Sequence, residues 1–182
     1  MNTRVTMLML ALVVLIGGGS ILYNILTASE EAPVVPEKGG ADERIAAPDF
    51  VIEDAEGNEV RLSDMLGRPV VINFWASWCP PCRSEMPDFN KVYSELGDSV
   101  QFMMINAVGA RGETKEAGAK YVAKEGFSFP VFFDTDQGAV TVYGIRAFPT
   151  SIFIDADGYI AGAVEGAINE ASLRRGIDLI LK

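Results

Sequence analysis

Residues 70–97 read VVINFWASWCPPCRSEMPDFNKVYSELG, and this stretch contains both of the chain's cysteines. Its first residues, 70–74, form a short and nearly continuous run of strand-forming residues, typical of a central strand covered on both faces. After the cysteines, apolar residues recur at helical spacing until Gly97, which is a helix stop signal. The stretch therefore predicts a strand, a short turn that holds the cysteines, and a helix.

Cys79 and Cys82 lie where the predicted helix begins. A sulfur at a helix N-terminus meets unpaired N–H groups and the positive end of the macrodipole, which stabilise a thiolate and lower the cysteine pKa. The thiolate is the attacking form in thiol–disulfide exchange, and Cys82 lies one helical turn after Cys79, where it can close a ring. Pro80 suits the first helical position, but Pro80 and Pro81 also remove two potential N–H donors to the sulfur, which opposes the dipole. We therefore predict a redox-active pair without assigning its reduction potential.

Other uses of the pair fit the sequence less well. A structural disulfide gains more stability from a longer loop, and this loop is very short. Covalent haem attachment needs His after the second cysteine, where this chain has Arg83. The chain of 182 residues has two cysteines and no histidine, which excludes Cys/His zinc sites, iron–sulfur clusters and His-dependent catalytic pairs. Its net charge of −10 argues against nucleic-acid binding.

The N-terminal part of the chain is predicted to lie outside the folded domain. Residues 5–26 carry no charged side chain and are long enough to span the hydrocarbon core of a bilayer as a helix, so we expect residues 1–27 to form an uncleaved transmembrane anchor. A cleaved signal peptide is the alternative, although the apolar run is longer than a usual h-region. Residues 28–45 are dominated by Glu, Pro, Gly and Ala and are expected to form a flexible linker.

Basic residues barely decide the orientation of this anchor. Arg4 lies on one side of the apolar run, whereas Lys38 and Arg44 lie on the other. An N-terminal export signal with a short basic end leaves the following domain outside the cytoplasm by default. We therefore expect a single-pass protein of the bacterial inner membrane with its domain on the periplasmic or extracytoplasmic side, where a redox pair needs electrons supplied across the membrane.

Residues 46–182 are predicted to form one domain of class α/β. Strand patterns occur at 50–52, 60–62, 70–74, 100–105, 130–133, 151–154 and 159–164, and helical patterns at 63–67, after the cysteines, at 114–125 and after Asn169. Alternating strands and helices favour a sheet with helices packed on its faces. An N-terminal β-hairpin begins the domain, and the Asp157-Gly158 turn predicts a second, antiparallel hairpin, which makes the sheet mixed.

The sequence resembles the TlpA/ResA-like branch of the thioredoxin superfamily, in its redoxin or AhpC/TSA-like group, which includes membrane-anchored reductases of cytochrome c maturation. The likeness lies in residues 47–50 (APDF), 73–87 (NFWASWCPPCRSEMP) and 148–150 (FPT), and it extends over residues 46–182. It implies a thioredoxin fold and a thiol–disulfide oxidoreductase with no cofactor beyond the redox-active Cys79–Cys82 disulfide. The implied partners are protein substrates with cysteine pairs, apocytochrome c among them, and a membrane thiol reductase that donates electrons.

The resemblance also implies roles for single residues. Cys79 would be the exposed nucleophile and Cys82 the buried resolving thiol. Pro149 matches the family's cis-proline opposite the cysteines, although only about 5–6% of X–Pro bonds in folded proteins are cis. With Pro149, the residues Trp78, Pro80 and Phe148 would form the surface on which substrates dock, whereas Trp75 is expected in the core.

Glu85 matches the family's active-site glutamate. A carboxylate one turn beyond Cys82 could pass a proton to the resolving thiol, but it could equally be a first-turn carboxylate that interacts favourably with the helix dipole. Asn73 stands where cytosolic thioredoxins have a buried aspartate, and asparagine does not accept a proton at neutral pH. Glu85 is therefore the leading candidate for that role.

Four functions remain open at this point. The first is a reductase of disulfides in exported proteins, and the second is an oxidant or isomerase; the resting redox state of the pair in cells would separate them. The third, a thiol peroxidase, is disfavoured because its motif needs Thr or Ser three residues before the reactive cysteine, where this chain has Ala76. The fourth is a redox-silent binding or chaperone module.

Overall fold

The computed structural model describes residues 44–181. The predicted anchor (1–27) and nearly all of the predicted linker (28–45) lie outside the described residues, so both stay predictions. None of the helices within residues 44–181 combines the length and the apolar character that a bilayer crossing requires.

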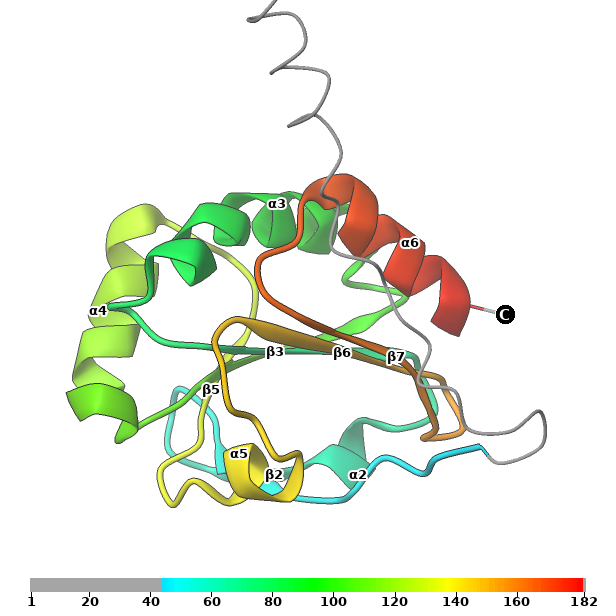
Figure 1. Cartoon of the computed structure of the whole chain (residues 1–182), viewed down its shortest axis with the longest axis horizontal. Helices are drawn as coiled ribbons and strands as arrows, with labels where there is room; N and C mark the ends of the chain where they lie inside the picture. The colour runs from blue at the N-terminus through cyan, green and yellow to red at the C-terminus, as the bar shows by residue number, and fades with distance from the viewer. Residues whose placement is uncertain (1–43, 182) are drawn as a thin grey trace, which may run out of the picture. The chain divides into compact units, whose positions relative to one another are not determined.

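A mixed seven-stranded sheet forms the centre of the described domain, with the strand order β2-β1-β5-β4-β3-β6-β7 (Figure 1). The strands are β1 (Val51–Glu53), β2 (Glu59–Arg61), β3 (Val70–Trp75), β4 (Gln101–Asn106), β5 (Val131–Phe133), β6 (Thr150–Ile154) and β7 (Ile160–Glu165). Strands β3, β4 and β5 are parallel, whereas β6 is antiparallel to both β3 and β7. Every residue of β3 is buried, because β3 has a strand on each side and helices over both faces. The predicted mixed sheet and central strand are confirmed.

Helices cover both faces of this sheet. They are α2 (Leu62–Met65), α3 (Pro80–Leu96), α4 (Lys115–Glu125), α5 (Gly138–Val142) and α6 (Glu170–Ile180), with a 3₁₀ turn η1 (Ala110–Gly112) before α4. Helices α3 and α6 lie over one face, and α2 and α5 over the other (Figure 1). The helix predicted after Asn169 is confirmed as α6, and the Asn169 side chain caps it by accepting the N–H of Ser172. Thr114 does the same for α4.

Two short elements, η1 and α5, escaped the sequence patterns. Helix α5 has only five residues, and a side chain just before it holds its start: the buried Asp134 carboxylate accepts the N–H groups of Ala139 at 3.2 Å and Val140 at 2.8 Å. In η1, Arg111 has a left-handed backbone with φ of 47°. Helices this short have no period that a sequence pattern can display.

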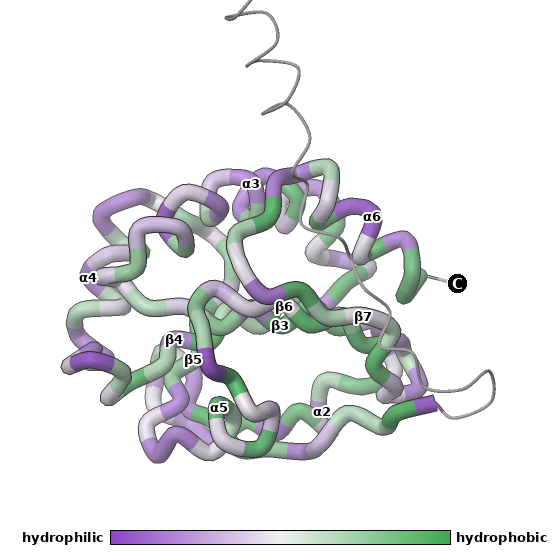
Figure 2. Tube along the Cα trace, in the orientation of Figure 1, coloured by the Kyte–Doolittle hydropathy of each residue, from purple (hydrophilic) through white to green (hydrophobic). Residues whose placement is uncertain are grey.

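Two apolar cores, one on each face of the sheet, hold the layers together (Figure 2). Trp75 is fully buried in the core between the sheet, α3 and α6, as predicted. Two residues before the predicted start of the domain at residue 46 already contact it. The Ile45 carbonyl accepts the N–H of Ile160 at 2.9 Å, and the Arg44 guanidinium pairs with Asp155 at 2.7 Å.

Candidate active site

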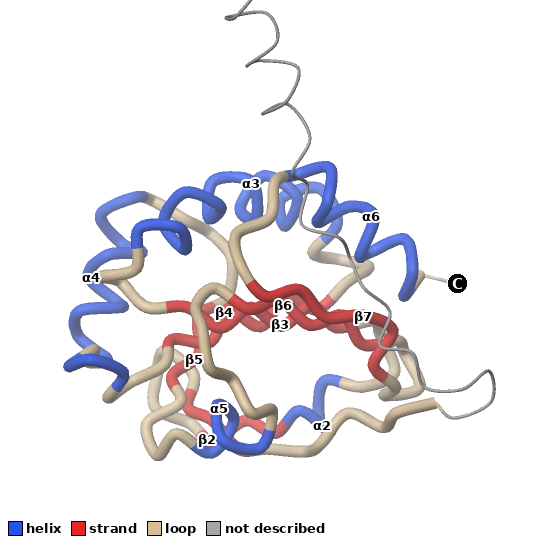
Figure 3. Tube along the Cα trace, in the orientation of Figure 1, coloured by secondary structure: helices blue, strands red, loops and turns tan. Residues whose placement is uncertain are grey.

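The cysteine pair lies where the chain passes from β3 into α3, because β3 ends at Trp75 and α3 begins at Pro80; Figure 3 shows these two elements. Cys79 is the N-cap of α3, and Pro80 is the first residue of the helix. The N–H that Pro80 lacks would have no partner within the helix at this position, so the proline costs no helical hydrogen bond. The Cys82 N–H donates to Cys79 Sγ at 3.3 Å. One donor therefore still reaches the sulfur after the two prolines, and it favours a thiolate at Cys79 in the reduced enzyme.

The two cysteines are joined in a disulfide, and both are buried, with 2% of Cys79 and none of Cys82 exposed. The resemblance implied an exposed Cys79, so the structure differs here. In this oxidised form the Cys79 sulfur is bonded to Cys82 and lies 3.5 Å from the Phe148 carbonyl oxygen. The loop before β6 thus covers the sulfur that a substrate must reach.

That loop contains Pro149, and the Phe148–Pro149 peptide bond is cis, as the resemblance implied. The Phe148 ring meets the Trp78 ring edge-on, with centroids 6.3 Å apart. The Trp78 indole N–H in turn donates to the Ala110 carbonyl at 2.9 Å. Trp78 and Phe148 are half-buried and Pro80 is exposed, so three of the four predicted docking residues reach the surface beside the disulfide, whereas Pro149 is buried.

Glu85 is a buried carboxylate with 2% of the residue exposed. Its Oε1 accepts from Asn73 Nδ2 at 2.8 Å and its Oε2 accepts the N–H of Ile168 at 2.8 Å. Burial raises its pKa to about 7 because these two donors only partly replace lost water. Glu85 is the sixth residue of α3, and no acidic residue lies in the first turn, so a first-turn dipole role does not apply. Its carboxyl can exchange a proton near neutral pH.

Asn73 completes the environment of this carboxyl. Its Nδ2 donates both to Glu85 and to Ser151 Oγ at 3.0 Å, while its buried Oδ1 has no partner. Turning the amide over would present Oδ1 to Glu85 as an acceptor for the protonated carboxyl. Asn73 does not titrate, but its amide can match either protonation state of Glu85.

Sequence reasoning missed Glu113, a second buried carboxylate, with 3% of the residue exposed. Its Oε1 accepts the N–H of Ser77 at 3.0 Å and Asn106 Nδ2 at 2.8 Å, and its Oε2 accepts from Ser77 Oγ at 2.8 Å. It ties the loop after β4 to the segment that leads into Cys79. No pattern signals this role, because Glu113 lies in a glycine-containing loop far along the chain from Ser77.

Residues 44–163 match the model of the AhpC/TSA family. The chain belongs to this family. This AhpC/TSA member is 32% identical over 170 residues to the thiol–disulfide oxidoreductase ResA of Bacillus subtilis (strain 168), a match that covers 93% of this chain and 88% of that one. It is a thiol–disulfide oxidoreductase, as its sequence predicts.

Solved structures similar to this AhpC/TSA member share its thioredoxin-like fold. A thiol:disulfide interchange protein of the thioredoxin family from Chlorobium tepidum TLS has a TM-score of 0.68 at 27% identity, covering 79% of this chain and all of that one. The exposed lipoprotein thioredoxin Etrx1 from Streptococcus pneumoniae strain TIGR4 has a TM-score of 0.62 at 30% identity, covering 72% of this chain and 98% of that one. Within residues 44–181, no cluster of three or more Cys, Asp or Glu side chains is suited to hold a metal ion.

Proposed function

We propose that this oxidoreductase is a membrane-tethered, extracytoplasmic reductase of disulfides in exported proteins, apocytochrome c among them. The observation that carries the proposal is the pairing of a helix-capping sulfur, which accepts the Cys82 N–H, with a buried carboxyl one turn beyond Cys82. The uncharged run at residues 5–26 and the likeness to an exposed lipoprotein thioredoxin support the location. The likeness to the thiol–disulfide oxidoreductase ResA supports disulfide exchange as the reaction.

The reaction consists of two sulfur displacements. First, the Cys79 thiolate attacks one sulfur of the substrate disulfide; an S–S bond forms between Cys79 and the substrate, and the other substrate sulfur leaves as a thiolate that takes a proton. Second, Cys82 loses its proton and attacks the Cys79 sulfur. This step forms the Cys79–Cys82 disulfide and releases the second substrate sulfur. Two electrons pass from the enzyme dithiol to the substrate.

Glu85 receives the proton of Cys82 in the second step. It lies one helical turn after Cys82 on α3, and its pKa of about 7 allows it to take up and release a proton at neutral pH. The Asn73 amide hydrogen-bonds the carboxylate at 2.8 Å and keeps it in place between β3 and α3.

The surface around Cys79 holds the substrate. Trp78, Pro80 and Phe148 present apolar area beside the disulfide, and Pro149 fixes the course of the loop that carries the Phe148 carbonyl. A membrane thiol reductase returns the pair to the dithiol form.

Trapping of a mixed disulfide tests the reductase function. Full-length Cys82→Ser protein, expressed in cells, should retain an exported protein through Cys79 as a complex that a reducing agent dissolves. The Cys79→Ser variant is the matched control and should retain none. If Cys82→Ser traps no protein, the proposed function is wrong.

The resting redox state of the pair decides the direction of electron flow. Alkylation of free thiols in intact cells should find Cys79 and Cys82 mostly reduced, because a reductase must be supplied with electrons. A mostly oxidised pair would instead identify an oxidant or isomerase.

A further inference from the structure

Three arginines belong to the segments of the chain that lie next to the redox pair. Arg83 directly follows Cys82 in α3, Arg111 belongs to η1, and Arg146 lies two residues before Phe148. All three residues are exposed. The Arg111 guanidinium lies over the Trp78 ring at 5.1 Å from its centroid, which places a cation beside the segment that leads into Cys79.

These three cations belong to a chain with a net charge of −10. Within residues 44–181, none of them has a carboxylate at ion-pair distance. Two arginines away from the redox pair do have such partners: Arg44 pairs with Asp155 at 2.7 Å, and Arg174 pairs with Glu95 at 2.6 Å. Arg68, at the other end of β3, also has no carboxylate at ion-pair distance within residues 44–181, but its guanidinium donates to the Asp98 carbonyl at 3.0 Å. The three arginines next to the redox pair add positive charge where the substrate must dock.

The position of Arg111 is built into the loop that carries it. Its backbone is left-handed, with φ of 47° and ψ of 37°, a conformation that L side chains rarely adopt. Two contacts hold the loop in this course: the Trp78 indole N–H donates to the Ala110 carbonyl, and Glu113 bonds Ser77. An arginine in such a fixed loop loses less conformational freedom on binding than one on a mobile surface.

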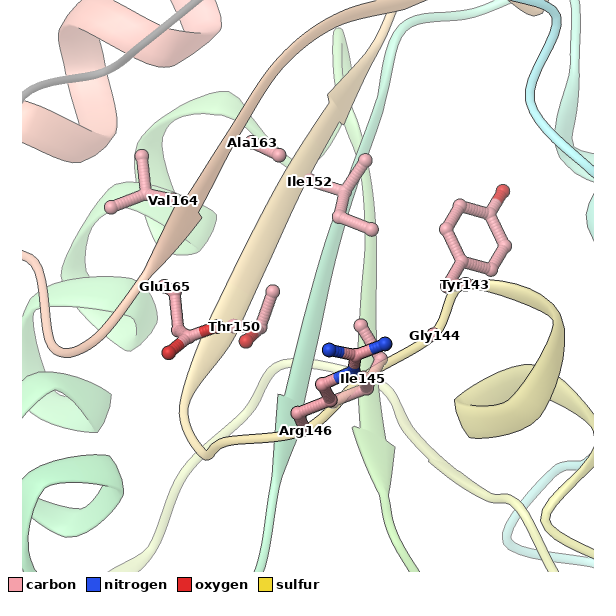
Figure 4. Close-up of a pocket in the computed structure, with 9 residues that line it drawn as sticks. All are labelled: Tyr143, Gly144, Ile145, Arg146, Thr150, Ile152, Ala163, Val164 and Glu165. Carbon is pink, nitrogen blue, oxygen red and sulfur yellow. The ribbon is translucent and has the colours of Figure 1, made fainter. Parts of the chain in front are cut away.

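Arg146, in the segment before Phe148, lines a pocket of about 350 Å³ (Figure 4). Thr150, the residue after Pro149, also lines this pocket, and Ile145, Ile152 and Ala163 give it apolar walls. Glu165 is the one carboxylate among the residues that line it. Because Glu165 partly offsets the charge of Arg146, Arg111 should attract an anion more strongly than Arg146 does.

We propose that this face selects substrate segments in which acidic side chains flank the attacked cysteine, with Arg111 and Arg146 as the residues that determine this specificity. The inference rests on the proposed reductase function and adds the substrate chemistry. Exposed ion pairs contribute modestly to the free energy of binding and are screened by salt. The preference for acidic substrate segments should therefore be moderate and should decrease with ionic strength.

Two disulfide-bonded peptides of equal length test the inference, one with Glu and one with Gln on both sides of its cysteine pair. The full-length protein in its dithiol form should reduce the Glu peptide with a kcat/KM about 5-fold higher at low salt, through a lower KM. At about 0.5 M salt the ratio should fall towards 1, because the Debye length is then only a few ångströms.

Variants connect the preference to the arginines. Arg111→Gln should remove most of the preference and Arg146→Gln a smaller part, whereas Arg111→Lys, which keeps the charge, should retain it. Arg68→Gln is the matched control: Arg68 is exposed, donates to the Asp98 carbonyl at 3.0 Å, and lies before β3, at the opposite end of that strand from Cys79. It should leave both kcat/KM values unchanged.

The outcomes separate the inference from the proposed function. Equal reduction of the two peptides at low salt, or a preference that Arg111→Gln retains in full, overturns the inference while the reductase function stands. If neither peptide is reduced, the proposed function itself fails, and the inference fails with it.

Discussion

Replacement of Glu85 by Gln should change how the stability of the oxidised protein depends on pH. Glu85 is buried, and its pKa is about 7 in the folded protein against 4.5 as the ordinary value. The folded state therefore holds the proton more tightly than the unfolded state. The stability that this proton contributes is complete below pH 4.5, decreases as the pH rises, and is absent above about pH 7.

The size of this effect follows from the two pKa values. A shift of about 2.5 units corresponds to about 3.4 kcal/mol across the full range, because each unit is worth about 1.36 kcal/mol. Between pH 5 and pH 8, the Glu85 proton should account for a loss of about 2.5 kcal/mol in the free energy of unfolding. Gln does not titrate, so the Glu85→Gln variant should lack this loss. The turned-over Asn73 amide can accept from the Gln side chain, which makes the variant a fair comparison.

Urea unfolding of both oxidised proteins at pH 5, 6, 7 and 8 measures the difference. Carboxyls whose pKa values are lowered by ion pairs, such as Asp155 and Glu170, act in the opposite direction but occur in both proteins and cancel. A constant offset between the two proteins would reflect only altered packing or hydrogen bonds. If the offset does not change between pH 5 and pH 8, the reasoning about Glu85 is wrong.

Three further predictions concern the surroundings of the site. Glu113→Gln should destabilise the protein by about 1–3 kcal/mol in urea unfolding, because an amide group cannot accept from all three donors; Glu116→Gln, an exposed change nearby, should cost less than about 0.5 kcal/mol. Gly176→Ala should lower the free energy of unfolding by about 1–3 kcal/mol, because its Cβ would collide with the fully buried Phe153 ring; an unchanged urea midpoint would contradict this. Trp78→Ala should raise the KM for a disulfide-bonded protein more than for a small disulfide, and equal increases would argue against a docking role.

Local patterns were sufficient for the elements that form the redox motif. The strand before Cys79 is recognisable because β3 is buried on both faces and is therefore apolar throughout. The helix after it is recognisable because α3 buries one face, and a cap such as Asn169 marks a helix start through a hydrogen bond to a residue three positions away. These features depend on neighbours in sequence.

The sequence by itself therefore determined the order of the main elements and the thiol pair at a helix start. Tertiary structure decided the antiparallel pairing of β1 with β5 and the loop that Glu113 holds against the segment before Cys79. It also decided the chemistry of Glu85, whose pKa rises because β3 and the Ile168 segment remove it from water. Desolvation and long-range hydrogen bonds depend on which distant residues become neighbours, and no local pattern encodes that.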